Sequence, residues 1–245
     1  MKPKNIRESW FQELRSSFED SRLEDLRQKL SKNASNICPE IEKVFKAFSY
    51  FDFGNTKVVL VFLSPYQRQL MTESGLTNYA TGLATAVPSG EFLTPTLGIL
   101  LSALEHYLQI PEIEEHFDWT LESWAQQGIL LLNRALTVEK NGNARSHIDD
   151  WTWFTRDVIK NLSDKLDRTM FVFLGKDAQY LDCVDRNKHE VLYTCHPVAT
   201  AYAYDNAGKS TTPIPDHLDF PKFEMFKKVD EFMLKTHNSK IQWIK

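Results

Sequence analysis

The sequence predicts an α/β fold in which a mainly parallel four-stranded sheet lies between two layers of helices. Four short segments are almost continuously apolar or aromatic, which is typical of strands buried on both faces of a parallel sheet. Segments with helical periodicity separate them. Strands that alternate with helices in this way build parallel sheets. The four strand segments are 57–63, 128–133, 169–175 and 190–197.

The first fifty residues are predicted to be helical and to pack against the rest of the chain. Apolar residues recur at helical spacing from 5 to 32, which indicates one or two amphipathic helices, and 39–48 indicates another short one. We see no internal repeat and no clear linker, so we expect residues 1–245 to form a single domain. The later helices are expected near 96–109, 118–127, 149–166, 176–182 and 222–236.

Composition narrows the class of protein. Hydrophobic residues make up 42% of the chain, which is enough for a full core. No apolar run approaches the length of a membrane span, and the first residues lack the apolar stretch of a signal peptide. We therefore expect an intracellular protein without a membrane partner. The net charge of −4 does not itself indicate a nucleic-acid binder, although a local basic patch would be enough for one.

The cysteines indicate neither a metal site nor a disulfide framework. Cys38, Cys183 and Cys195 are far apart in the sequence. They are too few for a four-thiolate zinc or iron–sulfur site, and an odd, sparse set is a poor basis for disulfides. We expect them to be reduced and buried.

Polar side chains follow the four predicted strands, at the points where the strands end. Ligands of open α/β sheets bind beyond the carboxyl ends of the strands. Several recognition side chains at one edge of a sheet are a stronger signal than one alone. We therefore expect the functional site at this edge. The segments in question are Ser64-Pro65-Tyr66-Gln67, Asn133-Arg134, Gly175-Lys176-Asp177 and His196-Pro197.

These strand ends, in this order, resemble the family 1 uracil-DNA glycosylases. The similarity extends from Trp10 to Trp243, and its most specific part is the pattern LLLNxxLTV with a later His-Pro. The resemblance implies the fold predicted above and a DNA glycosylase that needs no metal and no cofactor. The matching segments, each with the family motif beside it, are FLSPYQ at 62–67 for GQDPYH, ATGLATAV at 80–87 for AHGLCFSV, TPTL at 94–97 for PPSL, LLLNRALTV at 130–138 for LLLNAVLTV, LGKDAQ at 174–179 for WGSYAQ, and HPVATA at 196–201 for HPSPLS.

The resemblance implies a role for three pocket residues. Asn133 would pair with the edge of a pyrimidine, because a side-chain amide can donate one hydrogen bond and accept another. His196 would donate a hydrogen bond to O2 of the departing base and stabilise the negative charge that develops there. Tyr66 would pack against carbon 5 of uracil and exclude the methyl group of thymine. Without the resemblance, a turn-capping amide, an ordinary histidine and a core tyrosine would be the simpler interpretations.

The resemblance also implies a set of DNA contacts. Thr94, Thr96, Gly175 and Lys176 match loops that grip DNA phosphates in the family. Hydroxyl groups, backbone N–H groups and a lysine suit that role, although ordinary solvated loops would contain the same residue types. Thr200 stands where the family has the leucine that wedges into the duplex, and a small polar residue would support base flipping poorly. The following segment contains Tyr202 and Tyr204, either of which could supply a wedge instead.

Three further residues depart from the family pattern inside the pocket. Ser64 replaces the catalytic aspartate, which stabilises the cationic sugar and orients the attacking water. A hydroxyl can hold a water but supplies no charge, and losing one preorganised electrostatic group typically costs about 10²–10³ in rate. Gln67 replaces a histidine. Thr85 replaces the phenylalanine that stacks on uracil, and stacking of this kind is worth roughly 1–3 kcal/mol.

The sequence leaves two classes of function open. The first is a monofunctional DNA glycosylase that flips a pyrimidine nucleotide and hydrolyses its N-glycosidic bond. Asn133, His196 and Tyr66 remain while the stacking residue is lost, which favours a modified pyrimidine, with uracil as the alternative base. The second class is a catalytically weak or inactive DNA-binding or scaffold protein of the same fold. In either case we expect a monomer that binds single- or double-stranded DNA.

Overall fold

Four parallel strands form the central sheet, in the spatial order β5-β2-β7-β8. The computed structural model describes residues 3–206 and 216–245, and the side chains of all of these except 202–206. The strands coincide with the four predicted segments, to within a few residues at their ends. They are β2 (Val58–Phe62), β5 (Ile129–Asn133), β7 (Met170–Leu174) and β8 (Glu190–Thr194).

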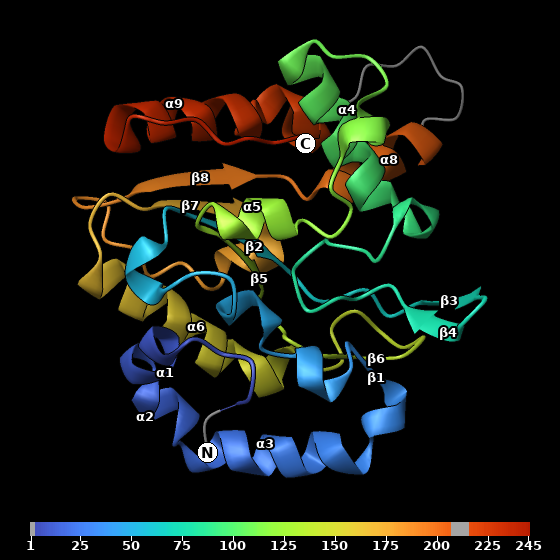
Figure 1. Cartoon of the computed structure of the whole chain (residues 1–245), viewed down its shortest axis with the longest axis vertical. Helices are drawn as coiled ribbons and strands as arrows, with labels where there is room; N and C mark the ends of the chain where they lie inside the picture. The colour runs from blue at the N-terminus through green and yellow to red at the C-terminus, as the bar shows by residue number, and fades with distance from the viewer. Residues whose placement is uncertain (1–2, 207–215) are drawn as a thin grey trace.

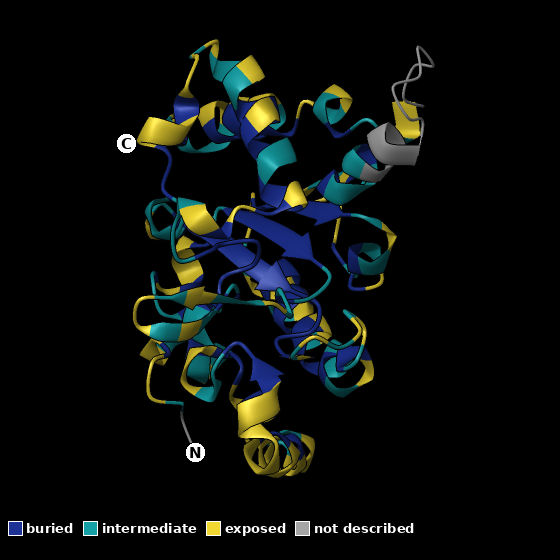
Figure 2. Ribbon diagram, turned by 90° about the vertical axis from the view of Figure 1, so that its right-hand side faces the viewer, coloured by how far each residue is buried: buried dark blue, intermediate teal, exposed yellow. Residues whose placement is uncertain are grey.

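Burial along the sheet differs between the strands. Every residue of β2, β5 and β7 is buried, as their apolar runs predict. Strand β8 lies at the edge and exposes Glu190 and Tyr193, so the expectation of burial on both faces is wrong for this strand. Figure 2 shows the strands in dark blue at the centre of the molecule, with exposed residues on the outer faces of the surrounding helices.

Helices cover both faces of the sheet, so the predicted three-layer architecture is confirmed. Helices α4 (Pro95–Leu108), α8 (Pro197–Asn206) and α9 (Met225–His237) lie on one side, and α6 (Ile148–Lys165) lies on the other together with the N-terminal helices (Figure 1). The two remaining helices are short: α5 (Glu122–Gln126) and α7 (Lys176–Gln179).

The N-terminal segment forms three helices rather than the one or two expected. They are α1 (Glu8–Glu13), α2 (Arg15–Phe18) and α3 (Ser21–Lys32). Asp20 is the N-cap residue of α3, and its side chain accepts a hydrogen bond from the backbone N–H of Arg22. The expectation of a helix over 39–48 is wrong, since this stretch holds two separate 3₁₀ turns.

The N-terminal helices share one hydrophobic core with the sheet. Trp10 is completely buried against three phenylalanine rings, and its indole N–H donates to the carbonyl of Phe51 at 2.8 Å. Polar contacts reinforce the packing against α6, where the Ser17 hydroxyl donates to Asp157 at 3.0 Å.

The C-terminal tail is held by one buried carboxylate. Asp230 on α9 accepts hydrogen bonds from the Tyr107 hydroxyl at 2.8 Å, from the Ile241 backbone N–H at 3.1 Å and from the Trp243 indole N–H at 3.2 Å. Trp243 packs edge-to-face against Trp124 with ring centroids 4.9 Å apart. These contacts attach the end of the chain to the helical layer of α4 and α9.

Two pairs of short strands and eight 3₁₀ turns complete the described fold, and none of them was expected from the sequence. Strand β1 (Ile37–Cys38) pairs with β6 (Val138–Glu139), and β3 (Gln69–Thr72) forms an antiparallel hairpin with β4 (Gly75–Asn78). No helix in the described part of the chain is both long and apolar enough to span a bilayer. The 3₁₀ turns are η1 (Ala34–Asn36), η2 (Ile41–Lys43), η3 (Lys46–Phe48), η4 (Phe53–Asn55), η5 (Gly90–Phe92), η6 (Ile113–His116), η7 (Asp216–Leu218) and η8 (Phe220–Phe223).

Candidate active site

The register of the parallel sheet brings the predicted strand ends to one edge. Phe62 at the end of β2 lies opposite Asn133 at the end of β5. The chain beyond β5 stays joined to β2, because the backbone N–H of Arg134 donates to the carbonyl of Phe62 at 2.8 Å. On the other side, the Gly175 N–H after β7 donates to the carbonyl of Thr194 in β8 at 3.0 Å. His196 follows two residues later.

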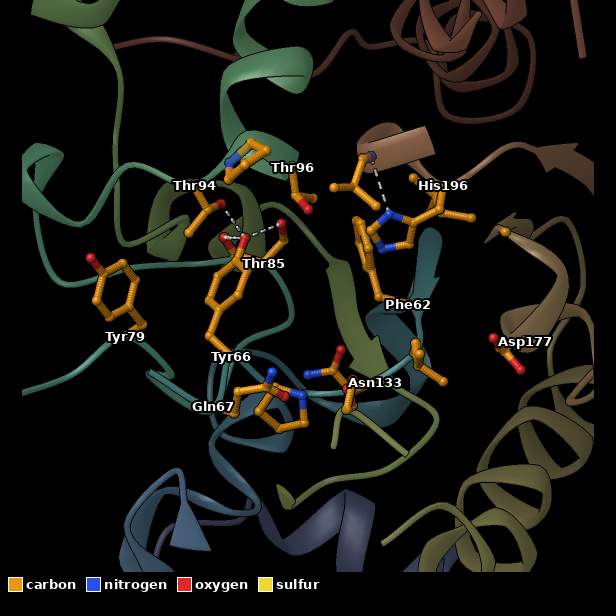
Figure 3. A pocket seen from close by; sticks show the side chains of 18 of the residues that line it. Phe62, Tyr66, Gln67, Tyr79, Thr85, Thr94, Thr96, Asn133, Asp177 and His196 are labelled. Atoms are coloured by element: carbon orange, nitrogen blue, oxygen red, sulfur yellow. Dashed lines mark hydrogen bonds between the residues drawn. The ribbon is translucent and has the colours of Figure 1, made fainter. Parts of the chain in front are cut away.

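A cavity of about 440 Å³ opens at this edge (Figure 3), within the size range of small-molecule sites. Every site residue predicted from the sequence lines it, except Thr200. The lining residues named in the predictions are Ser64, Tyr66, Gln67, Thr85, Thr94, Thr96, Asn133, Gly175, Lys176 and His196.

Asn133 lines the cavity and has an unused hydrogen-bond acceptor. Its side chain is 6% exposed, and its Oδ1 atom is buried with no hydrogen-bond partner among the described residues. Buried polar atoms in native proteins are nearly always paired, since an unpaired one costs about 1–3 kcal/mol. A ligand with a donor group at this position would remove that cost.

His196 presents an N–H donor to the same cavity. The backbone N–H of Val198 donates to its Nδ1 at 3.2 Å, which assigns the ring proton to Nε2. Burial lowers the pKa of His196 to about 4, against a smaller opposing effect of Asp177. The imidazole is therefore neutral at neutral pH. In Figure 3 the other ring nitrogen of His196 lies on the side away from the dashed hydrogen bond.

Two neighbours fix the position of the His196 ring. Phe62 lies edge-to-face to it, with ring centroids 6.1 Å apart. Gly175 passes so close that a Cβ atom added there would lie 2.9 Å from the Cβ of His196. Gly175 also has φ of +89°, a conformation that other residues rarely adopt. A glycine is thus required at position 175 for two reasons: the positive φ of the backbone and the close approach of His196.

The opposite wall of the cavity is built around the hydroxyl group of Tyr66. Thr94 donates a hydrogen bond to it at 2.9 Å, and the Thr85 hydroxyl lies 3.0 Å away. The Tyr66 hydroxyl in turn donates to the Thr85 carbonyl at 3.3 Å, and Thr96 contributes a further hydroxyl to the group. Burial raises the pKa of Tyr66, so the phenol stays protonated. We call these four residues the hydroxyl cluster.

Thr85 adopts a strained backbone conformation. Its φ is +61°, in the left-handed region, which is a real outlier for a β-branched residue. Such strain costs of the order of 1–3 kcal/mol and persists only where the surroundings enforce it. Here the hydrogen bonds from and to Tyr66 hold both the carbonyl and the hydroxyl of Thr85 in place.

The two threonines expected to grip phosphates lie inside the protein instead. Thr94 and Thr96 are 9% and 7% exposed. Thr94 caps the N-terminus of α4 by accepting from the Leu97 N–H at 3.2 Å, while its own proton goes to Tyr66. Their hydroxyls are therefore engaged in the pocket wall. Lys176, by contrast, is exposed at the rim of the cavity, where it can meet a phosphate.

Thr200 does not reach the cavity or the surface. It lies on α8, not in a loop, and is 1% exposed. Its hydroxyl donates to the carbonyl of Leu218 at 2.7 Å and accepts from the N–H of Phe220 at 2.9 Å. A side chain used in this way cannot contact DNA or wedge into a duplex, so we correct this prediction. The side chains of Tyr202 and Tyr204 lie outside the described residues.

The cavity lining also includes residues to which no role was assigned from the sequence. Among them are Phe62, Arg68, Tyr79 and Asp177. A position-by-position comparison of FLSPYQ with GQDPYH would have found Phe62, which stands where the family motif has glycine. Asp177 is a carboxylate in the cavity wall, but Arg145 pairs with it at 2.5 Å and Arg134 lies 4.0 Å away. Its charge is thus already matched.

The described residues contain no cluster of three or more histidine, cysteine or acidic side chains that could hold a metal ion. Besides the charged side chains of Arg68, Lys176 and Asp177, the donors and acceptors of the cavity are amide, imidazole, hydroxyl and backbone groups. Such a set suits hydrogen-bonded recognition of a planar heterocycle, with one neutral donor placed to stabilise an anion.

Comparison with known proteins places the chain in a family. The model of the uracil DNA glycosylase superfamily matches residues 48–216. Uracil-DNA glycosylase of Idiomarina loihiensis is 32% identical over 238 residues, which cover 96% of this chain and 94% of that protein. The one from Aliarcobacter butzleri is 31% identical over 222 residues, or 89% and 92% of the two chains.

A solved structure agrees with these sequence relationships. The crystal structure of mimivirus uracil-DNA glycosylase superposes with a TM-score of 0.80 at 28% identity, over 97% of this chain and 87% of that chain. The fold and the site thus define an enzyme of the DNA glycosylase class. The chain belongs to the uracil DNA glycosylase superfamily.

Proposed function

We propose that this protein hydrolyses the N-glycosidic bond of a pyrimidine nucleotide flipped out of DNA into the cavity. One observation carries the proposal: Asn133, whose Oδ1 is unpaired, and neutral His196, whose ring proton is on Nε2, line the same cavity. A pyrimidine ring offers an N–H group to the former and a carbonyl oxygen to the latter. The substrate would be DNA inside the cell, as for other base-excision enzymes.

The proposed reaction uses each of these groups once. Water attacks C1′ of the sugar, the bond from C1′ to N1 of the base breaks, and its electron pair leaves with the base. The negative charge spreads to O2, where the Nε2–H of His196 stabilises it. Ser64, at the cavity wall, would hold the attacking water. The proton that the water loses neutralises the anion of the base, so the products are an abasic site and the free base, and no cofactor takes part.

We propose a modified pyrimidine, rather than plain uracil, as the preferred base. Thr85 replaces the phenylalanine that the resemblance implies as the stacking residue, so a smaller side chain stands at this wall of the cavity. The hydroxyl cluster of Tyr66, Thr85, Thr94 and Thr96 gives the wall polar character. A polar substituent on carbon 5, such as hydroxymethyl, could hydrogen-bond there. An electron-withdrawing substituent also makes the base a better leaving group, which reduces the need for a carboxylate at position 64.

The experiment that tests the proposal is alkali-revealed strand cleavage on labelled oligonucleotides. The panel holds uracil, thymine, 5-hydroxymethyluracil and glucosylated 5-hydroxymethyl pyrimidines, in single and double strands. We expect cleavage at a 5-substituted pyrimidine by the wild type and none by His196→Ala. Cleavage at uracil alone would support glycosylase activity but contradict the proposed preference for a modified pyrimidine. The absence of any cleavage would overturn the glycosylase.

The alternative of a non-catalytic DNA-binding protein rests on one observation, the hydroxyl of Ser64 in place of a carboxylate. That function needs neither the Asn133 acceptor nor the oriented His196. It would be favoured if the chain bound DNA without excising any base of the panel. In both cases we propose that the protein acts as a monomer.

A further inference from the structure

The β3–β4 hairpin carries a pair of unusually exposed apolar side chains. Met71 is 69% and Leu76 is 63% exposed. The two residues are direct cross-strand partners, so their side chains lie on the same face of the hairpin. Large apolar side chains at this exposure cost free energy in water and are typical of surfaces that meet a partner.

The hairpin is anchored firmly enough to hold these side chains in place. On its other face Leu70 packs against the hydrophobic core. The Thr72 hydroxyl donates to the Gly75 carbonyl at 2.9 Å across the two-residue turn, and lies 3.1 Å from the Thr77 hydroxyl. At its base, the Tyr79 N–H donates to the Arg68 carbonyl at 3.0 Å. The exposed pair therefore sits on a fixed support.

The hairpin is continuous with the wall of the active-site cavity. Gln67 and Arg68 immediately precede β3, Tyr79 immediately follows β4, and all three line the cavity. The N–H of Asn141 donates to the Gln67 carbonyl at 2.8 Å and fixes this junction. Figure 1 shows the hairpin projecting from the edge of the molecule where the strands of the sheet end. The hairpin that carries Met71 and Leu76 thus extends directly from the cavity wall.

An enzyme that flips a base leaves a gap in the base stack, and proteins often fill such gaps with apolar wedges, among them leucine and methionine. Thr200, where the resemblance places the wedge, is buried. We propose that Met71 and Leu76 form the wedge of this protein and enter the duplex beside the flipped pyrimidine. This inference rests on the proposed function, since only base flipping requires a wedge.

The charges of the hairpin define how it would approach the duplex. Arg68 is exposed at the base of the hairpin, where it can contact a phosphate. Glu73, in the turn, is exposed and would be repelled by phosphates. The face that carries Met71 and Leu76, rather than the turn itself, therefore meets the bases.

The test compares duplex and single-stranded DNA, because a wedge is needed only where bases are stacked in a helix. The substrates are a 5-hydroxymethyluracil oligonucleotide as a single strand and as a duplex, with 2-aminopurine beside the target in a second duplex. The variants are Met71→Ser with Leu76→Ser, and the exchange Met71→Leu with Leu76→Met, which keeps both positions apolar. Leu234→Ser is the matched control, since this exposed leucine (46%) lies on α9.

For the serine pair we expect a loss of about tenfold or more in excision from duplex, since unstacking a base step must then proceed unaided. Excision from the single strand should stay within about twofold, and the exchange variant and Leu234→Ser should match the wild type. The rise of 2-aminopurine fluorescence on binding should shrink for the serine pair alone. This fluorescence reports flipping even if the wild type excises nothing, so failure of the wedge is distinguishable from failure of the glycosylase.

Three results would overturn the wedge. The first is undiminished excision from duplex by the serine pair, with an unchanged fluorescence rise. The second is an equal loss on both substrates, which would mean that the hairpin only shapes the cavity. The third is a wild-type dimer in sedimentation that the serine pair dissociates without any effect on duplex DNA, which would identify the pair as a contact between two copies of the chain.

Discussion

The backbone N–H of Val198 donates a hydrogen bond to Nδ1 of His196, at 3.2 Å. This bond leaves Nε2 as the nitrogen that carries the proton, so the residue faces the cavity as a neutral donor. Protonation of Nδ1 would set two N–H groups against each other and add a charge to a buried site. In the proposed reaction, His196 would therefore stabilise the developing anion by a hydrogen bond from a neutral ring.

His196 should remain neutral far below the ordinary histidine range, because burial lowers its pKa to about 4 from 6.5. Between these values the unfolded chain binds a proton that the folded chain does not. This residue therefore reduces stability as the pH falls from 6.5 towards 4, by up to about 3 kcal/mol, and has no effect above 6.5. NMR titration of the His196 ring measures this pKa, and a midpoint near 6.5 would show that burial does not lower it.

His196→Ala should lower the rate of base excision by about 10²–10³, because it removes the donor that stabilises the leaving base. Folding, followed by circular dichroism, and DNA binding should both be retained. His116→Ala is the matched control, since this histidine is exposed in η6, and it should match the wild type. Equal rates for the two variants would exclude His196 from the chemistry.

Gly175→Ala should impair excision although it adds only one methyl group. The new Cβ would lie 2.9 Å from the Cβ of His196, and the backbone has φ of +89°. Gly98→Ala adds the same group in α4, where no atom lies within 4 Å of the new Cβ, and should raise stability by about 0.5–1 kcal/mol. Single-turnover excision and urea denaturation of both variants test the pair. Normal excision by Gly175→Ala would show that His196 is not tightly held.

Ser64→Asp should raise excision of plain uracil by about 10²–10³, because it places a negative charge beside the cationic sugar of the transition state. The rate is measured on a uracil duplex at saturating enzyme. Ser64→Asn, which is similar in size but uncharged, serves as the control. If the two variants behave alike, charge at position 64 does not limit the reaction.

Asp230→Ala should destabilise the fold by about 3 kcal/mol, because three donors lose their charged acceptor inside the protein. The midpoint of urea denaturation measures the change. Asp25→Ala, at an exposed position of α3, should have little effect. A small effect of Asp230→Ala would mean that the C-terminal tail adds little to stability.

Residue patterns predicted the sheet well because each of its strands can be recognised from a short stretch of sequence. A run such as that of β2 is apolar at every position only when both faces are covered, and it ends before Ser64 and the Pro-Tyr turn. The same reasoning placed Asn133 and His196 at one edge, since parallel strands end together. The burial of strand β8 was harder to predict, because aromatic residues such as Tyr193 make an edge strand resemble a buried apolar one in sequence.

Features that depend on distant partners were not predictable in this way. Thr200 belongs to an α-helix whose packing buries its hydroxyl against Leu218 and Phe220, and nothing local indicates that. The φ of +61° at Thr85 arises from its bonds with Tyr66, nineteen residues away. The β3–β4 hairpin has polar strands with a weak alternation, so its pairing of Met71 with Leu76 emerged only from the structure.

In the proposed function, the protein excises a 5-substituted pyrimidine that is bound in this cavity. The most direct measurement is the single-turnover release of free base, by mass spectrometry, from matched duplexes that contain 5-hydroxymethyluracil or uracil. We expect the wild type to release 5-hydroxymethyluracil faster than uracil, and His196→Ala to release neither base. Faster release of uracil, or release that persists in His196→Ala, would contradict it.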